Sequence, residues 1–513
     1  MAERTNAIGE AGGPLAATLV LALVIAGLLP VALLGLGSGE AAKAFDAYTV
    51  RVIAFTLWQA LLSTALSALL GVGAALALAR RTFWGRTQLV QLLAVPMALP
   101  AIVAVLGLIG IFGANGPLAG WIPLYGLTGI LLAHVFFNAP LMARLVLASL
   151  GTIPTEQLRL AGQLGLTDLA HFRHVDWPVL RQALPGSLLL IFLLCVASFT
   201  VVLTLGGGPS ASTLEVAIYQ ALRSDFDPAR ATLLALVQIA LCGLLGWGVL
   251  RASATFQTQD ALRLTKRRFD GQSLPARIAD SLALLLLVAL LAPPLAAVVV
   301  TGVTNVSASG SLLRALGTSL ALCCTTATVT CLLAWMLASW SARAPARKGL
   351  TTLVSQAGLI LPPAVIATGW FILASKGPGL PLLALPFIIA LNGLMALPFA
   401  HGILAPALHG QLASHDKLCA TLGISGWNRL RHIDLPAASA PLALAFSMAA
   451  LVSLGDLSAI LFFGGGRYVT LPALIYQQMG SYRMEGAMGT ALVLAVLSFA
   501  FLWAADAWSR RHA

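Results

Sequence analysis

Residues 172–178 read FRHVDWP, and residues 430–436 read LRHIDLP. The two heptapeptides lie 258 positions apart and share Arg-His, Asp and Pro. Their surroundings agree in the same register, because Leu-Gly occurs at both 164–165 and 422–423. Coincidence does not keep one register over most of two half-chains. The sequence therefore predicts a duplicated unit, each copy carrying one of these polar stretches.

The rest of the chain is strongly apolar. Of its 513 residues, 59% are hydrophobic and 9% are charged, with a mean hydropathy of +0.92. Soluble domains have about 25% charged residues. In lipid only helices and closed barrels satisfy the backbone hydrogen bonds, and unbroken apolar runs such as 281–300 favour helices over the short alternating strands of a barrel. The sequence predicts an all-α integral membrane protein.

A bilayer-crossing helix needs about 20 apolar residues, and twelve runs meet this requirement. The first run has 23 residues, longer than the 7–15 residues of the apolar core of a secretory signal peptide, so we expect a retained span. Six spans in each copy give both copies the same orientation, as parallel repeats. The predicted spans are 14–36, 51–79, 88–113, 127–148, 186–205, 229–250, 280–302, 313–338, 350–374, 385–408, 442–462 and 487–508.

The net charge of +12 has two interpretations, nucleic-acid binding or an excess of Lys and Arg on cytoplasmic loops. With both termini cytoplasmic, the inner segments hold 22 of the 30 basic residues and the outer segments hold 8. This ratio favours the second interpretation and places both heptapeptides in the cytoplasm. We predict one repeat over 1–256, a basic cytoplasmic linker over 257–277 and a second repeat over 278–513.

Each heptapeptide ends a long inner loop, 149–185 in the first copy and 409–441 in the second. Both loops contain a helix-favouring stretch, a glycine and a second stretch that ends in proline. Glycine suits a helix C-cap or tight turn, and proline suits the first turn of the helix that follows. We expect two short helices in a bend. A DNA-reading helix–turn–helix and an ordinary solvated loop are the alternatives, but the duplication favours two docking elements for a partner with two equivalent surfaces.

At this point the sequence resembles a known family. The pattern EAA-xxx-G-x9-I-x-LP marks the membrane subunits of ATP-binding-cassette importers, and both loops fit it from the Leu-Gly to the Pro. The resemblance implies the type I importer permease fold, with each loop forming a coupling helix that fits into a cleft of an ATPase subunit. We name 149–185 and 409–441 the N-terminal and C-terminal coupling segments.

The resemblance assigns coupling to fourteen positions, although the family's Glu position is occupied by Arg159 and Lys417, so the resemblance does not extend to an acidic contact with the ATPase. The coupling residues are Arg159, Ala161, Gly165, Arg173, His174, Asp176 and Pro178 in the first copy, and Lys417, Cys419, Gly423, Arg431, His432, Asp434 and Pro436 in the second.

The stretch 204–238 resembles the fused membrane subunit of thiamine importers, and ferric-iron importers of the same family are similar. The resemblance implies transport of thiamine or its phosphates, with ferric iron as the alternative. It also implies two ATPase subunits, a soluble substrate-binding protein on the outer face, and a bacterial plasma (inner) membrane location. An ion-coupled secondary transporter is a second alternative, and a channel or scaffold a third.

No GxxxxGK[ST] phosphate loop and no H-E-x-x-H motif occurs in the chain. We therefore predict a transport subunit without catalytic residues, cofactor or bound metal, whose ATP is used by partner subunits. The six cysteines form no CxxC pair and suit small core positions. The expected contacts are lipid and protein, with no nucleic acid.

Polar residues inside apolar spans are candidates for the substrate path. The strongest is Asp456, whose counterpart at offset 258 is Ser198. The alternative for Asp456 is a structural pair or a hydrogen bond at a helix end. Asn138 and Asn392 are further path candidates, and interhelical hydrogen bonds are their favoured alternative, as for His134.

Overall fold

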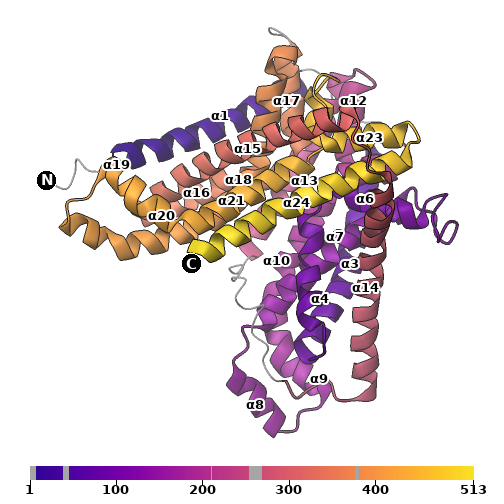
Figure 1. Ribbon diagram of the computed structural model, residues 1–513. Helices are drawn as coiled ribbons and strands as arrows, with labels where there is room; N and C mark the ends of the chain where they lie inside the picture. Colours follow the sequence, from indigo (N-terminus) through magenta and orange to yellow (C-terminus); the bar gives the residue numbers. More distant parts are fainter. Residues whose placement is uncertain (1–6, 38–45, 209–210, 253–267, 376–379, 513) are drawn as a thin grey trace. The chain divides into compact units, whose positions relative to one another are not determined.

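The computed structural model describes residues 7–37, 46–208, 211–252, 268–375 and 380–512 (Figure 1). Every regular element over these residues is a helix, as predicted. Within the described ranges, nine helices are long and apolar enough to cross a membrane, and three bent pairs of shorter helices raise the number to as many as twelve. The prediction of an all-helical membrane protein with about twelve spans is confirmed.

The helices form two compact units, each described by itself. The first comprises Met1–Asp46, Ala217–Ile239 and Thr304–Ala513, and the second comprises Ala47–Val216 and Ala240–Val303.

The second unit is built on the packing of α3 (Ala47–Arg80) against α7 (Leu127–Leu150) and of both against α10 (Trp177–Val196). Its core buries Leu78 and Phe136 completely. Its other helices are α4 (Arg86–Leu92), α5 (Val95–Ala98), α6 (Ala101–Phe112), α8 (Thr155–Gln163), α9 (Asp168–His171), the π-helix η2 (Phe172–Asp176), α11 (Thr200–Leu205) and most of α14 (Leu274–Asn305).

In the first unit α15 (Gly310–Arg343), α18 (Leu380–Thr421) and α21 (Ser439–Gly455) pack against one another, and α24 (Met484–His512) packs on α21 (Figure 1). The unit boundaries fall within α12 (Leu214–Arg223) and α13 (Pro228–Ala252). The other helices of this unit are α1 (Ala7–Gly37), the 3-10 helix η5 (Pro345–Arg347), α16 (Lys348–Ile360), α17 (Pro363–Ser375), α19 (Gly426–Arg429), the π-helix η6 (Leu430–Asp434), α20 (Leu435–Ala437), α22 (Ser458–Phe463) and α23 (Leu471–Gly480).

The residue ranges of these compact units do not coincide with the sequence repeats 1–256 and 278–513. The first helix of the first repeat, α1, packs on α15 and α17 of the second repeat. The first helix of the second repeat, α14, contributes Leu287 and Leu291 to the core around α3 and α7. Each unit thus takes the leading span of the other repeat. The linker 257–277 is described only from residue 268 onward, and its earlier residues lie outside the described part of the chain.

The predicted spans 88–113 and 350–374 are not single straight helices. The first bends by 110° between α4–α5 and α6, and the second bends by 86° between α16 and α17. Both bends fall at a Leu-Pro step, 99–100 and 361–362, where the leucine has extended backbone (ψ 132° and 112°). A proline disfavours the helical conformation of the residue before it. The same break therefore recurs at equivalent points of the two repeats.

The contact between α1 and α17 depends on small residues. A Cβ atom added to Gly369 would lie 1.7 Å from the carbonyl oxygen of Gly27. Next to it, the indole nitrogen of the buried Trp370 donates a hydrogen bond to the Leu23 carbonyl oxygen at 3.1 Å. Small residues at helix interfaces allow this close backbone approach in membrane proteins.

Gly369→Ala should therefore destabilise the chain by about 2–3 kcal/mol, since an extra methyl in a packed contact forces the helices apart. Thermal unfolding of the purified chain in detergent measures the loss. Gly317→Ala on α15 is the matched control, because its added Cβ meets no atom within 4 Å and alanine is the better helix former. Equal unfolding temperatures for the two variants would contradict the close contact.

Candidate functional site

The N-terminal coupling segment is a bent helical unit of four parts. Helix α8 ends at Gln163, a turn follows, and α9, η2 and α10 then run on continuously from Asp168. Thr167 caps this second stretch, because its hydroxyl oxygen accepts a hydrogen bond from the backbone nitrogen of Ala170 at 3.3 Å. Pro178 lies in the first turn of α10. The predicted short first helix and the bend are confirmed for this copy, whereas the second helix is not short, because it continues as one helix from Asp168 to Val196.

The C-terminal coupling segment differs at both ends. Its first helix is not separate, because α18 continues from the membrane span to Thr421. The first copy has Pro154 between α7 and α8, and no proline stands at the matching place in the second. At the other end a bend of 74° separates Gly426–Ala437 from Ser439–Gly455. Pro441, which replaces Ala183 of the first copy, cannot donate the helical hydrogen bond to Ala437.

The turn is the same in both copies. Gly165 and Gly423 have positive φ angles of 61° and 65°. The residue after each glycine donates a backbone hydrogen bond to the carbonyl five positions earlier, Leu166 to Ala161 at 3.2 Å and Ile424 to Cys419 at 2.9 Å. This is the Schellman pattern of a helix C-terminus. The glycine prediction is confirmed by the backbone geometry.

The repeated heptapeptides form a rare structure. Phe172–Asp176 and Leu430–Asp434 are both π-helical, over matching positions. Single π turns are frequent at functional sites. The repeated sequences FRHVD and LRHID thus share one backbone irregularity, at matching positions of the two copies.

The predicted coupling residues separate into outward and inward positions alike in both copies, except at the aspartate and proline positions. The glycines are exposed, Arg173 and Arg431 are exposed, and so are His174 and His432. Ala161 and Cys419 are buried, with 4% and 1% exposure. Asp176 is buried, whereas Asp434 is only half-buried. Arg159 is exposed and Pro436 is more exposed than Pro178. The side chain of Lys417 lies outside the described part of the structure.

Four exposed apolar pairs were missed by the sequence reasoning. Each pair stands at offset 258, so the same surface recurs on both segments, and large exposed apolar groups of this kind mark contact sites. Their recurrence at offset 258 was visible in the sequence, but their exposure comes only from the fold. The pairs, with their exposures, are Leu160 and Leu418 (54% and 55%), Leu164 and Leu422 (66% and 61%), Leu169 and Trp427 (76% and 61%), and Trp177 and Leu435 (45% and 37%).

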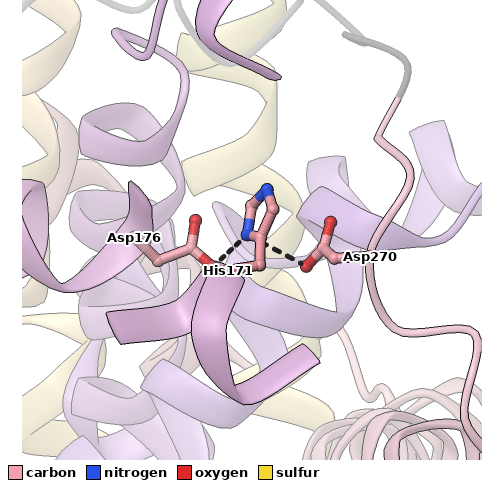
Figure 2. Close-up of side chains that lie close together, drawn as sticks. All are labelled: His171, Asp176 and Asp270. Atoms are coloured by element: carbon pink, nitrogen blue, oxygen red, sulfur yellow. Dashed lines mark ion pairs between the residues drawn. The ribbon is translucent and has the colours of Figure 1, made fainter. Parts of the chain in front are cut away.

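Asp176 belongs to a buried network of charges (Figure 2). Arg268 donates to both of its oxygens, at 2.9 and 2.8 Å, and also to Asp270 at 2.9 Å. Arg80 donates to Asp270 at 2.8 Å. Burial would raise the pKa of Asp270, but hydrogen bonds and charge from Arg268 outweigh it and hold that pKa at about 2. The carboxylate is therefore ionised at neutral pH.

Figure 2 shows His171, Asp176 and Asp270 turned toward one another, with ligand-type atoms within 4.8 Å. Such a group could hold a metal ion. The imidazole Nδ1 lies 3.5 and 3.6 Å from the two carboxylates. However, the guanidinium groups of Arg80 and Arg268 already lie against these carboxylate oxygens. We therefore interpret this group as an ion-pair network, in which the arginines compensate the charges a cation would otherwise balance.

The second copy compensates its aspartate locally. Arg429 lies 3.4 Å from Asp434 and 2.6 Å from Asp416. Arg429 stands where the first copy has His171. Asp434 is therefore paired with an arginine of its own segment, whereas the equivalent Asp176 is paired with Arg268 from outside its segment.

Asp456 lies at a helix break. It follows α21 with extended backbone, and its carboxylate accepts hydrogen bonds from the backbone nitrogens of Ser458 and Ala459 at 3.2 and 2.8 Å. This is the geometry of a helix N-terminus, the structural alternative considered for Asp456. Ser198 lies at the equivalent break between α10 and α11. A role of either residue in the substrate path stays a prediction.

The remaining path candidates form side-chain hydrogen bonds between helices. Asn138 donates to the Cys195 sulfur at 3.3 Å, and Asn392 donates to the Ser453 hydroxyl at 3.1 Å. The two acceptors, Cys195 and Ser453, lie 258 positions apart, so both repeats place a hydrogen-bond acceptor at this position. His134 is hydrogen-bonded to Ser63 at 3.0 Å. Such bonds are common in membrane bundles.

The described helices form a multi-pass membrane bundle, and its class, a transport permease, follows from comparison with a protein family. Residues 331–512 match the family model described as the inner membrane component of binding-protein-dependent transport systems.

The full chain has close relatives. It is 43% identical to the thiamine transport system permease protein ThiP of Brucella melitensis biotype 1, over 100% of this chain and 98% of the relative. It is 42% identical to ThiP of Salmonella typhimurium, over 91% and 90% of the two chains, and 41% identical to ThiP of Escherichia coli K12, over 95% and 94%. The chain belongs to the family of thiamine transport system permease proteins, multi-pass proteins of the inner membrane.

Proposed function

We propose that this chain is the membrane-spanning subunit of an ATP-driven thiamine importer, with both termini in the cytoplasm. Two coupling segments would each dock one ATPase subunit, and a soluble binding protein would deliver thiamine to the outer face. The observation that carries the docking is the recurrence of exposed apolar side chains at matching positions of both segments. The relatives named as thiamine permeases support the substrate.

The proposed mechanism is alternating access. Nucleotide would close the two ATPase subunits and draw the coupling segments together, and the helices that follow each segment would move with it. The chain supplies the conduit and no phosphate loop of its own. Exposed Leu164 and Leu422 directly precede the glycine turns, so they would insert first into a cleft on the partner.

Reconstitution tests this function. We expect the purified chain, its ATPase and its binding protein in liposomes to accumulate labelled thiamine only with ATP. Uptake of ferric iron in place of thiamine would overturn the substrate, and uptake driven by an ion gradient without ATP would overturn the importer class.

Leu164→Ser and Leu422→Ser should each weaken ATPase binding about tenfold, since burying a leucine side chain contributes about 1.5–3 kcal/mol and 1.4 kcal/mol corresponds to a factor of ten. Co-purification and titration of the labelled ATPase measure this effect. Trp121→Ser is the matched control, because Trp121 is 78% exposed but lies outside both segments. Unchanged binding by both leucine variants would place the ATPase elsewhere on the chain.

A further inference from the structure

The end of the central linker lies on the N-terminal coupling segment. Arg268 donates hydrogen bonds to both carboxylate oxygens of Asp176, at 2.9 and 2.8 Å. Eight residues earlier in the segment, Asp168 accepts hydrogen bonds from the backbone nitrogen of Gly271 at 2.5 Å and from the side chain of Ser273. The linker end is thus attached to the start and to the end of the stretch that contains the π-helix.

The same residues are attached to two long helices. Asp270 accepts a hydrogen bond at 2.8 Å from Arg80, the last residue of α3. Arg81, which follows it, donates to the carbonyl of Gly271 and, at 2.8 Å, to Asp280 of α14. Residues 268–273 therefore lie between the coupling segment and the ends of α3 and α14.

These contacts are specific to the first copy. At offset 258, Asp168 is replaced by Gly426, which has no carboxylate to hold a linker. His171 is replaced by Arg429, which gives Asp434 a cation from its own segment. The first copy has a histidine at this position, so Asp176 pairs with a guanidinium from outside the segment. That guanidinium belongs to Arg268, whose side chain is 3% exposed.

We propose that residues 268–273 form a brace that transmits the movement of the N-terminal coupling segment to α3 and α14. Arg268 and Asp270 are positioning residues of this brace. The inference rests on the proposed function, because it assumes that an ATPase moves the segment. In the C-terminal copy the long helix α18 continues directly into the segment, so the second copy needs no brace.

Arg268→Ala tests the brace in the reconstituted complex. ATP hydrolysis should stay within about twofold of wild type, because the docking surface is intact, whereas thiamine taken up per ATP hydrolysed should fall about tenfold. Arg268→Lys keeps the cation and should restore most of the ratio. Arg314→Ala is the matched control, since Arg314 is exposed and its side chain donates a hydrogen bond to the Gly310 carbonyl of its own helix, away from residues 268–273.

A second variant separates transmission from simple charge balance. Arg268→Ala combined with His171→Arg gives Asp176 a cation from its own segment, as in the second copy. We expect the double variant to reach the wild-type level of assembled complex but to keep the low uptake per ATP. Recovery of uptake would overturn the brace and leave Arg268 as charge compensation only.

A crosslink tests the brace without removing a charge from the buried network. In the variant Asp168→Cys/Ser273→Cys, oxidation should preserve uptake, because the brace stays attached throughout the cycle. Loss of uptake on oxidation, regained on reduction, would overturn the proposal. If wild type itself shows no ATP-dependent uptake, the proposed function fails. If wild type is coupled and Arg268→Ala behaves identically, the brace alone fails.

Discussion

Replacing both Gly165 and Gly423 with valine should lower ATP-driven thiamine uptake by roughly 100-fold. Both glycines have φ near +60° and lie in the turn inside each coupling segment, before the helical stretch that contains the π-helix. A left-handed conformation costs an L-residue roughly 1–2 kcal/mol, and a β-branched residue is a genuine outlier there. Each 1.4 kcal/mol corresponds to a factor of ten, and two turns are disturbed together. Uptake into liposomes measures the loss.

Asparagine at the same positions is the matched control. It adopts the left-handed region far more readily than valine does, and an added Cβ meets no atom within 4 Å at either glycine. Gly165→Asn with Gly423→Asn should therefore lose only a few-fold of the uptake. If the asparagine and valine pairs were equally impaired, the backbone conformation would not be what these positions require.

The repeat and its turns were predictable because they leave local signals. A glycine marks where the first helix of each segment ends, and the proline at fixed spacing lies in the first turn of the α-helix that follows each π-helix. The bends at Leu99–Pro100 and Leu361–Pro362 carry a similar signal. They were overlooked because the apolar run continues across each proline, and length alone then indicates one straight span.

The rest of the site depends on contacts that no local pattern encodes. Leu164 and Leu422 do not stand out in a chain that is 59% hydrophobic, so their exposure emerges only from the fold. The pairing of Asp176 with Arg268 joins residues 92 positions apart. The packing partners of α1 and α14 were likewise not predictable from the sequence. Any apolar helix fits lipid equally well, and the shape of its surface determines its protein neighbours.

Asp176→Ala should lower the free energy of unfolding of the chain by about 3–5 kcal/mol. The Asp176 side chain is completely buried and lies 2.8 Å from Arg268 and 3.9 Å from Arg80, which are themselves 3% and 10% exposed. Removing one partner of a buried ion pair leaves an uncompensated charge in a medium that solvates it poorly. Thermal unfolding of the purified chain in detergent measures the change.

Asp434→Ala is the matched control at the repeat-equivalent position. Asp434 is 18% exposed, its contact with Arg429 is longer at 3.4 Å, and Arg429 keeps Asp416 as a second partner at 2.6 Å. This loss should therefore be about 1 kcal/mol, near the range of exposed pairs. Equal losses at the two positions would mean that the aspartate stabilises the π-helical turn itself, since that turn is what the copies share. A larger loss at Asp176 alone would trace the difference to residues 80 and 268, which only the first copy contacts.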